Sequence, residues 1–275
     1  MEKEALTIDS SRNYAHHNDG PQQREWYQRL KRQIVPELTF NQTLYEDVLA
    51  RHVSPKSVWM DAGCGHRVLP NWRAESELEL VKRARVALGC DVDVAAIRVH
   101  RSLKNRVISD LGHLPFKSGT VTLITCNMVA EHLDYPEPVF REFARVLAPG
   151  GDIIVHTPFR WSYFAIVSAL TPQFIKSKIG RLLDDRPVHD YYPVRYRCNT
   201  PRRLRTLFRR VGLQEVRASL FASDAILQFL ANSSVGRLIL RMELYLLRLS
   251  LNRRWRFLRL SICGVYRKVT ADRGT

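Results

Sequence analysis

The sequence predicts an α/β fold in which helices cover both faces of a doubly wound, seven-stranded sheet. The strands are expected to be mostly parallel with an antiparallel last strand, and inserted helices are expected in the C-terminal half. Short apolar runs typical of buried strands alternate with amphipathic segments, which favours parallel strands joined by right-handed crossovers. Four of these runs also stop at a polar residue, as expected where an open sheet binds a ligand at its carboxyl edge.

Five strands are predicted in the first part of the chain. They occupy residues 57–60, 86–90, 106–109, 121–126 and 152–156, and the fifth follows a predicted turn at 149–151. Apolar residues between Leu44 and Val53 predict a helix before the first strand. A second apolar stripe, from Val139 to Leu147, predicts a helix before the fifth strand.

The C-terminal part contains a helix with clear signals at both ends. Thr200 is the expected N-cap, Pro201 takes the first helical position and Gly212 follows the last turn. The runs at 213–221 and 258–268 predict the two final strands.

The composition is that of a globular protein. Hydrophobic residues make up 45% of the 275 residues and charged residues 25%, which excludes global disorder. Residues 1–22 are polar and lack periodicity, so a flexible tail is expected before a single domain at 23–275. No apolar run reaches the roughly 18 residues of a membrane span, and the start is not that of a signal peptide. The five cysteines include no C-x-x-C pair, so no disulfide framework and no metal site are predicted, and a cytoplasmic location is favoured.

Polar residues and glycines at four strand ends outline a nucleoside-shaped site. The first strand ends in a loop whose glycines let backbone N–H groups approach a ligand closely. The carboxylate after the second strand can accept hydrogen bonds from both hydroxyls of a ribose. The residues predicted to bind the cofactor are Asp61, Ala62, Gly63, Cys64, Gly65, Asp91, Asp110, Leu111 and Asn127.

This succession resembles the class I S-adenosylmethionine-dependent methyltransferases, which have a Rossmann-like fold. In that family an acidic-x-Gly-x-Gly loop holds the methionine and ribose of the cofactor. The acidic residue after strand two binds the ribose hydroxyls, and an aspartate after strand three binds the adenine amino group. The resemblance implies these roles for Asp61, Gly63, Gly65, Asp91 and Asp110.

Three further segments are similar to that family. They are the "DLGHLPF" segment at 110–116, the "EHL" segment at 131–133 and the "RVLAPGG" segment at 145–151. The resemblance is strong over residues 55–157 and weaker over 200–268. It implies S-adenosylmethionine as cofactor and a methyltransferase activity, with 55–157 as the cofactor-binding core.

The main rival within the fold is a nicotinamide-dependent oxidoreductase. Its G-x-G-x-x-G/A fingerprint requires Gly or Ala at position 68, where Val68 stands. Two departures from the methyltransferase pattern concern the same loop. Arg67 replaces the family's frequent third glycine, and the segment from Gly65 to Asp91 exceeds the roughly 20 residues usual between such a loop and its acidic partner.

Three histidines are the candidate catalytic residues, because methyl transfer needs a general base only where the acceptor is protonated at neutral pH. His132 follows the fourth strand, and His156 is expected at the rim of the active site, near the end of the fifth. His189 lies beside Asp190 in a tyrosine-rich segment. A structural or surface role is the alternative for each histidine.

The acceptor is expected to be a small metabolite, a glycan or a lipid-linked molecule that is methylated on oxygen. No Asn-Pro-Pro-Tyr-like segment follows the fourth strand, where residues 127–130 read Asn-Met-Val-Ala, so a nucleic-acid base is disfavoured. An RNA or other nucleic-acid methyltransferase and a catalytically silent methyltransferase-like binding protein are the alternatives.

The net charge of +16 is concentrated in the second half of the chain. Residues 1–150 contain 20 Lys and Arg against 19 Asp and Glu, whereas residues 151–275 contain 23 against 8. Such asymmetry points to an anionic partner. Residues 158–199 and 222–257 are interpreted as insertions that contact the acceptor, a membrane or a partner.

Segment 234–257 predicts a basic amphipathic helix. Its many leucines accompany Arg237, Arg241 and Arg248, a composition that suits the surface of an anionic membrane. A cytoplasmic protein held peripherally at the inner membrane surface is therefore one expectation. A helix packed on the sheet or in a dimer seam is the alternative, and the sequence leaves the oligomeric state open.

Overall fold

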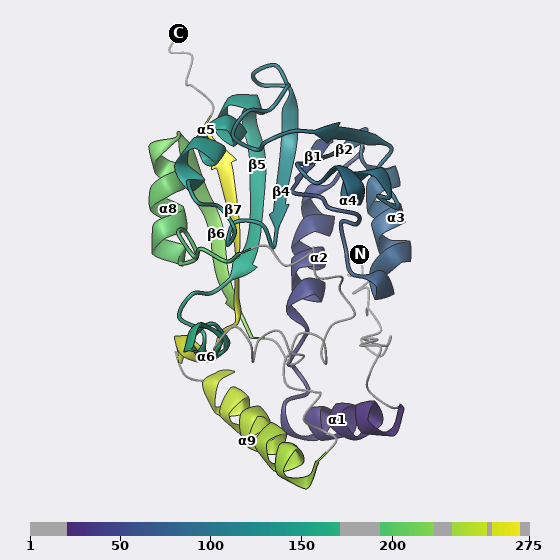
Figure 1. Cartoon of the computed structure of the whole chain (residues 1–275), viewed down its shortest axis with the longest axis vertical. Coiled ribbons are helices and arrows are strands. Elements are labelled where there is room, and N and C mark those ends of the chain that lie inside the picture. The colour runs from purple at the N-terminus through teal and green to yellow at the C-terminus, as the bar shows by residue number, and fades with distance from the viewer. Residues whose placement is uncertain (1–20, 171–192, 223–232, 252–254, 270–275) are drawn as a thin grey trace, which may run out of the picture.

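The computed structural model describes residues 21–170, 193–222, 233–251 and 255–269. Its centre is a seven-stranded sheet with the strand order β3-β2-β1-β4-β5-β7-β6 (Figure 1). β7 is antiparallel to both of its neighbours, and the remaining pairs are parallel. The predicted doubly wound sheet with an antiparallel last strand is thereby confirmed, and that last strand lies inside the sheet.

The strands follow the predicted apolar runs. They are β1 (Val58–Ala62), β2 (Val86–Asp91), β3 (Asn105–Ile108), β4 (Val121–Asn127), β5 (Leu147–Pro158), β6 (Leu213–Phe221) and β7 (Ser261–Lys268). β5 differs most from its prediction, because the turn expected at 149–151 lies within the strand. Leu147 already pairs with Val121, and the register shifts before Leu123 pairs with Asp152.

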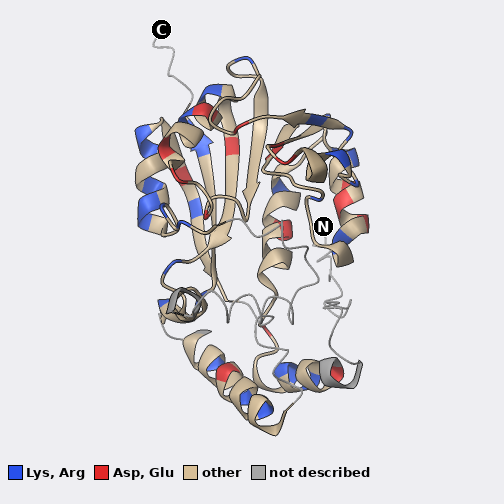
Figure 2. Cartoon of the chain, viewed as in Figure 1, with Lys and Arg blue, Asp and Glu red and all other residues tan. Residues whose placement is uncertain are grey.

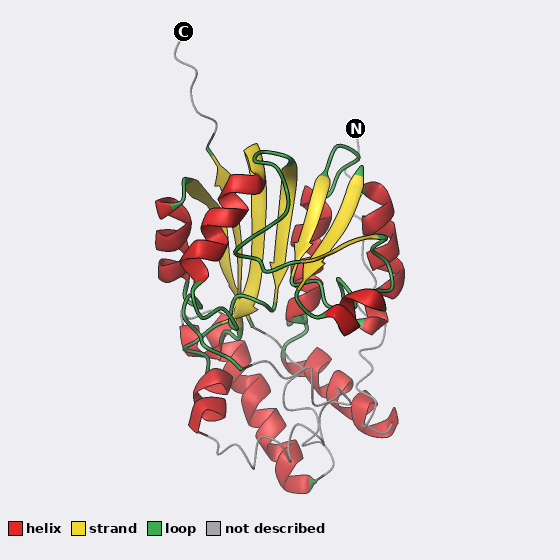
Figure 3. Ribbon diagram, turned by 45° about the horizontal axis from the view of Figure 1, so that its top comes forward, coloured by secondary structure: helices red, strands yellow, loops and turns green. Residues whose placement is uncertain are grey.

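Helices cover both faces of the sheet (Figure 3). They are α1 (Pro21–Ile34), α2 (Asn41–His52), α3 (Ala74–Arg83), α4 (Val94–Arg98), α5 (Pro136–Val146), α6 (Tyr163–Leu170), α8 (Pro201–Arg210) and α9 (Ser234–Leu251), with 3-10 turns η1 (Asn71–Arg73) and η4 (Arg256–Leu258). On one face Phe140 of α5 stacks on Phe208 of α8, with 4.3 Å between the ring centroids. On the other face Tyr45 of α2 packs in the cluster around Trp59 of β1.

The predicted N-cap of α8 is confirmed. Thr200 has an extended backbone conformation, and its hydroxyl accepts a hydrogen bond of 3.2 Å from the backbone N–H of Arg203. Such a cap satisfies one of the N–H groups that the first helical turn leaves without an intrahelical partner.

Helix α1 was not predicted from the sequence. It begins at Pro21, inside the predicted tail, and Tyr27, Leu30 and Ile34 pack in a cluster with Leu240 and Leu244 of α9. Residues 1–20, which make up most of that tail, lie outside the described residues. Across the described part of the chain, no helix is long and apolar enough to cross a membrane.

The α1–α9 pair and α6 lie at one end of the molecule. In Figure 1, β4 and β5 run downward, so their carboxyl ends point toward α6 and toward this helix pair. The polar residues predicted at the strand ends therefore lie on the same side of the sheet as α1, α6 and α9.

Candidate active site

The loop after β1 is shaped by its two glycines. Gly63 and Gly65 have φ angles of +72° and +52°, which are costly for residues with side chains. A Cβ atom on Gly63 would lie 2.4 Å from Cγ2 of Val129, whereas a Cβ atom on Gly65 would meet nothing within 4 Å. The loop is therefore packed against the segment after β4 at Gly63 and borders open space at Gly65, where a ligand can approach the backbone.

Asp91 at the end of β2 is joined to this loop. Its Oδ2 accepts a hydrogen bond of 2.7 Å from the backbone N–H of Gly65, and its Oδ1 accepts one of 2.9 Å from the backbone N–H of Asp93. Each carboxylate oxygen can accept a further hydrogen bond. The side chain is thus held in place while it retains the capacity to bind the two hydroxyls of a ribose.

Asp61 occupies a different environment, within β1 itself. Only 4% of its area is exposed, and its Oδ1 accepts a hydrogen bond of 2.6 Å from the hydroxyl of Thr125 on β4. Burial raises the pKa of Asp61 to about 8, with the hydrogen bond from Thr125 opposing the shift and the charges of Glu77 and Asp91 adding to it. The carboxyl group is therefore protonated at neutral pH in the absence of a nearby cation.

The remaining predicted cofactor residues lie around the same edge. Asp110 is exposed in the loop after β3, where its Oδ1 accepts a hydrogen bond of 2.6 Å from the backbone N–H of Gly112. Leu111 packs against the core, and Ala62 and Cys64 are buried. Because β3, β2 and β1 are adjacent, the structure brings Asp61, the glycine loop, Asp91 and Asp110 together at one edge of the sheet.

The sequence predicted His156 at the rim of the active site, but the residue lies deeper, within the sheet. β5 continues through Pro158, and the imidazole is completely buried. Its Nδ1 lies 2.8 Å from Oδ1 of Asn127 on β4, and its Nε2 lies 3.0 Å from Oγ of Ser261 on β7. The ring also stacks on Tyr45, with 5.2 Å between centroids, and burial lowers the pKa of His156 to about 3. This neutral side chain therefore joins β4, β5 and β7.

The backbone orients the imidazole of His132. Its Nδ1 lies 3.1 Å from the carbonyl oxygen of Pro193, and because a carbonyl only accepts, we assign the hydrogen to Nδ1. Nε2 is then the basic nitrogen, 3.8 Å from Oε1 of Glu131. Burial lowers the pKa of His132 below its ordinary value, although the hydrogen bond to Pro193 opposes the shift, so the imidazole is neutral at pH 7.

Glu131 was not predicted as a site residue, although it belongs to the "EHL" segment. It is 2% exposed, and its Oε2 accepts a hydrogen bond of 2.8 Å from the hydroxyl of Thr157, which in turn accepts one of 2.5 Å from Nδ2 of Asn199. Burial raises the pKa of Glu131 to about 7. The signal that could have revealed it is a charged residue beside a candidate base. His189, the third candidate, lies outside the described residues.

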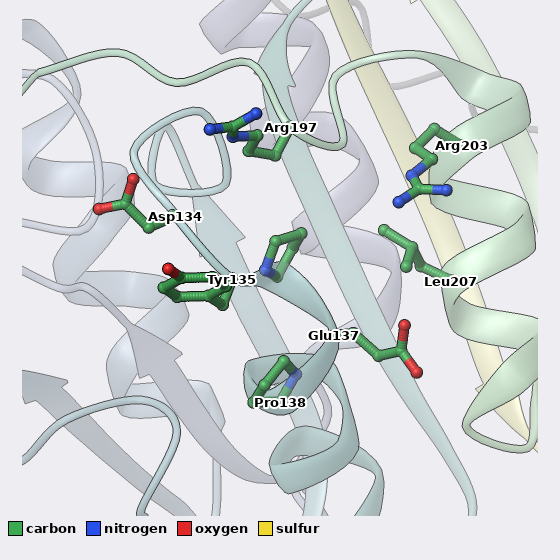
Figure 4. Close-up of a pocket in the computed structure, with 8 residues that line it drawn as sticks. Asp134, Tyr135, Glu137, Pro138, Arg197, Arg203 and Leu207 are labelled. Atoms are coloured by element: carbon green, nitrogen blue, oxygen red, sulfur yellow. The ribbon is translucent and has the colours of Figure 1, made fainter.

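A surface pocket of about 420 Å³ lies between the first turns of α5 and α8 (Figure 4). It is lined by Asp134, Tyr135, Pro136, Glu137, Pro138, Arg197, Arg203 and Leu207. None of the predicted cofactor or catalytic residues lines it, so this pocket is separate from the glycine-loop site.

Comparison with known proteins bears on the same part of the chain. Residues 60–155, which include the glycine loop, Asp91, Asp110 and His132, match the family model described as a methyltransferase domain. Among curated proteins, no sequence matches the chain.

Several solved structures share the fold. Geranyl diphosphate C-methyltransferase from Streptomyces coelicolor A3(2), solved with Mg²⁺, geranyl diphosphate and S-adenosyl-L-homocysteine, gives a TM-score of 0.51 at 16% identity, over 82% of this chain and 77% of that chain. The protein solved with the Trm112 methyltransferase activator of Haloferax volcanii gives a TM-score of 0.53 at 16% identity, over 90% of this chain and 95% of that chain. The [4+2]-cyclase SpnF gives a TM-score of 0.52 at 15% identity, over 82% of this chain and 81% of that chain. At these identities the likeness concerns the fold alone.

The match over residues 60–155 and the strand order together define the class of protein. Residues 60–155 form a methyltransferase domain, and the chain has the Rossmann-like fold of the class I S-adenosylmethionine-dependent methyltransferases. It is an enzyme, and S-adenosylmethionine is its methyl donor.

Proposed function

We propose that this methyltransferase transfers its methyl group to a hydroxyl of a small metabolite, a glycan or a lipid-linked molecule, with His132 as general base. The observation that carries the proposal is the orientation of the His132 ring. Pro193 fixes the hydrogen on Nδ1, which leaves Nε2 as the basic nitrogen beside Glu131. A hydroxyl needs such a base, because it stays protonated at neutral pH.

We place the cofactor at the edge formed by β1, β2 and β3. Asp91 would hold the ribose hydroxyls, Asp110 the adenine amino group, and the backbone of the loop at Gly63–Gly65 the methionine portion. The open space beside Gly65 supports this arrangement, because a Cβ atom there would meet nothing within 4 Å. When bound, the cofactor supplies a methyl group on a positively charged sulfur, so the protein's own contribution is positioning and proton removal.

The residues after β4 favour an apolar acceptor. Met128 has a φ of +57° and is 38% exposed. This left-handed backbone conformation costs free energy and is often kept at functional sites. The backbone N–H of Met128 is held by the carbonyl oxygen of His156 at 2.7 Å. An exposed methionine in this position offers a soft, adaptable contact to a hydrocarbon.

The proposal is tested by transfer of a labelled methyl group from S-adenosylmethionine to a panel of hydroxyl-bearing acceptors. The panel comprises free phenols and sugars, glycans, and lipid-linked sugars. Label recovered on oxygen is the expected result, and it should be lost in His132→Asn while cofactor binding is retained. Label found only on nitrogen or carbon atoms of these molecules, with His132→Asn fully active, would contradict it.

A nucleic-acid acceptor is the second candidate, because α8 carries a cluster of exposed arginines. They are Arg202, Arg203, Arg205, Arg209 and Arg210. Arg205 is paired with Glu215 at 2.7 Å and Arg210 with Glu137 at 3.4 Å, which lowers the positive charge available to phosphates. If RNA is the substrate, the chain should bind RNA with an affinity that falls steeply as salt is added. The double variant Arg202→Gln with Arg209→Gln should then bind RNA more weakly.

A further inference from the structure

Helix α9 buries one face against α1. Leu240, Leu244 and Leu247 are completely buried in the cluster that α9 shares with α1. Glu243 also faces inward, because it accepts a hydrogen bond from the hydroxyl of Tyr163 on α6. The inward face of α9 therefore contacts both α1 and α6.

The opposite face of α9 is apolar and exposed. Seven of its side chains have between 42% and 69% of their area exposed, namely Val235, Leu238, Ile239, Met242, Tyr245, Leu246 and Leu249. At 100° per residue these seven positions form one continuous stripe about 120° wide. Single exposed apolar residues are common on soluble proteins, but a continuous stripe of this kind marks an interaction surface.

Three arginines border this stripe along one side. Arg237, Arg241 and Arg248 are exposed, and at 100° per residue they fall within about 40° of one another, between the buried face and the apolar stripe. Arg237 lies over the ring of Trp26 at 5.3 Å from its centroid. The one acidic residue of the helix, Glu243, points away from this surface, so the exposed side of α9 carries only positive charge.

Apolar side chains are also exposed on α6 and η4, at the same end of the molecule. Trp161, Phe164 and Val167 are exposed next to or on α6, and Phe257 is exposed on η4. Figure 1 shows α6, η4 and α9 beyond the carboxyl ends of β4 and β5, and Figure 2 shows basic residues on both α1 and α9. The apolar and basic surface therefore lies at the same end of the sheet as the candidate active site.

The geometry points to the exposed face of α9 as a docking surface for an anionic lipid bilayer. The stripe from Val235 to Leu249 would enter the boundary between headgroups and acyl chains. Arg241 and Arg248 would reach the lipid phosphates, as long basic side chains do at interfaces. This inference deepens the proposed function, because it favours an acceptor that is carried by the membrane.

Charge favours an anionic bilayer over a second copy of the chain as the partner of this surface. If two α9 helices met face to face and antiparallel about a twofold axis, their arginine borders would lie on the same side of the contact and repel each other. The net charge of +16 per chain adds to that repulsion. A bilayer with acidic headgroups accepts both the apolar stripe and the arginines.

The test is co-sedimentation of the full chain with vesicles of phosphatidylcholine alone and of phosphatidylcholine mixed with phosphatidylglycerol. Binding to the mixed vesicles, weakened by high salt, is the expected result. The double variant Arg241→Gln with Arg248→Gln should reduce binding about 30-fold, given the contribution of each basic residue near an anionic surface. The matched control, Arg202→Gln with Arg209→Gln on α8, removes the same charge elsewhere and should bind like the parent chain.

A second variant tests the apolar stripe. Met242→Gln with Leu249→Gln should lower binding to the mixed vesicles at both salt concentrations, with the circular dichroism spectrum unchanged. No binding by the folded parent chain at low salt would overturn the inference, as would equal losses in the α8 control. So would a stable dimer that the Met242→Gln with Leu249→Gln variant converts to monomer. Vesicle binding requires neither cofactor nor acceptor, so its failure is distinguishable from failure of the proposed function.

Discussion

The backbone N–H of Gly65 donates a hydrogen bond of 2.7 Å to Oδ2 of Asp91, and this bond joins the loop after β1 to the end of β2. A single carboxylate therefore has two tasks. It fixes the conformation of the glycine loop, and it presents its remaining lone pairs to a ligand. The consequence is that the loop and the carboxylate proposed to bind the ribose are positioned as one unit before the cofactor arrives.

Asp91→Ala should weaken the binding of S-adenosylmethionine and of S-adenosylhomocysteine by on the order of 1–3 kcal/mol, because a charge-assisted pair of hydrogen bonds is lost. Isothermal calorimetry measures the change. Asp93→Ala is the matched control, since Oδ1 of Asp93 caps α4 through the N–H groups of Ala95 and Ala96. Unchanged affinity in Asp91→Ala, or tighter binding of a nicotinamide dinucleotide by the parent chain, would contradict the assignment.

The two glycines of the loop should respond differently to alanine. Gly65→Ala places its Cβ in open space, so it should cost roughly 1–2 kcal/mol of stability from the left-handed backbone while sharply reducing cofactor affinity. Gly63→Ala should lower the free energy of unfolding further, because its Cβ would lie 2.4 Å from Cγ2 of Val129. Adding Val129→Ala should recover part of that loss. Denaturant titration measures all three variants, and equal stability of the two single variants would rule out this account.

Cofactor binding should release a proton from Asp61. Burial raises the pKa of this carboxyl to about 8, and a cationic methionine ammonium or sulfonium nearby favours the ionised form. Calorimetry at pH 7 in buffers of different ionisation enthalpy should therefore reveal proton release, which Asp61→Asn abolishes. The same pKa shift makes the stability of the folded chain depend on pH. The folded state of the cofactor-free chain holds a proton that the unfolded state has lost, so the contribution of Asp61 to stability falls as pH rises from about 4 to about 8.

His132→Asn should lower turnover on a hydroxyl acceptor about 100-fold or more and leave cofactor affinity unchanged. Because burial lowers the pKa of His132, the rate of the parent enzyme should decline at a lower pH than an imidazole with its ordinary pKa would give. His156→Asn is the comparison. Since both ring nitrogens of His156 bond to neighbouring strands, that variant should lose thermal stability in addition to activity. An unaltered rate in His132→Asn would leave His189 as the remaining candidate.

The sheet, and the gathering of the glycine loop, Asp91 and Asp110 at one of its edges, were predictable because their signals are local. Each of the first four strands is a short apolar run with a polar residue at or just after its end, and the residues of the glycine loop are contiguous. The burial of His156 was not predictable in this way. It depends on Asn127, Ser261 and Tyr45, which come from three distant segments and meet only in the folded sheet.

Helix α1 escaped prediction for a related reason. Its apolar residues, Tyr27, Leu30 and Ile34, are few and are separated by charged and amide side chains. They become a core only against Leu240 and Leu244, more than half of the chain away. The length of β5 was misjudged because Pro149, Gly150 and Gly151 are typical turn residues, yet they lie at an irregular stretch of the strand beside β4.

The position of β7 between β5 and β6 constrains how this protein can be made. β6 leaves the ribosome before β7, yet among the described strands β7 is the one that pairs with it. Until residues 261–268 emerge, β5 presents an unpaired edge with the apolar segment Ile153, Ile154 and Val155, which invites pairing with other chains. Translation that stops shortly before β7 therefore yields an aggregation-prone polypeptide instead of a shortened enzyme, and chaperone protection during synthesis is needed most over this last stretch.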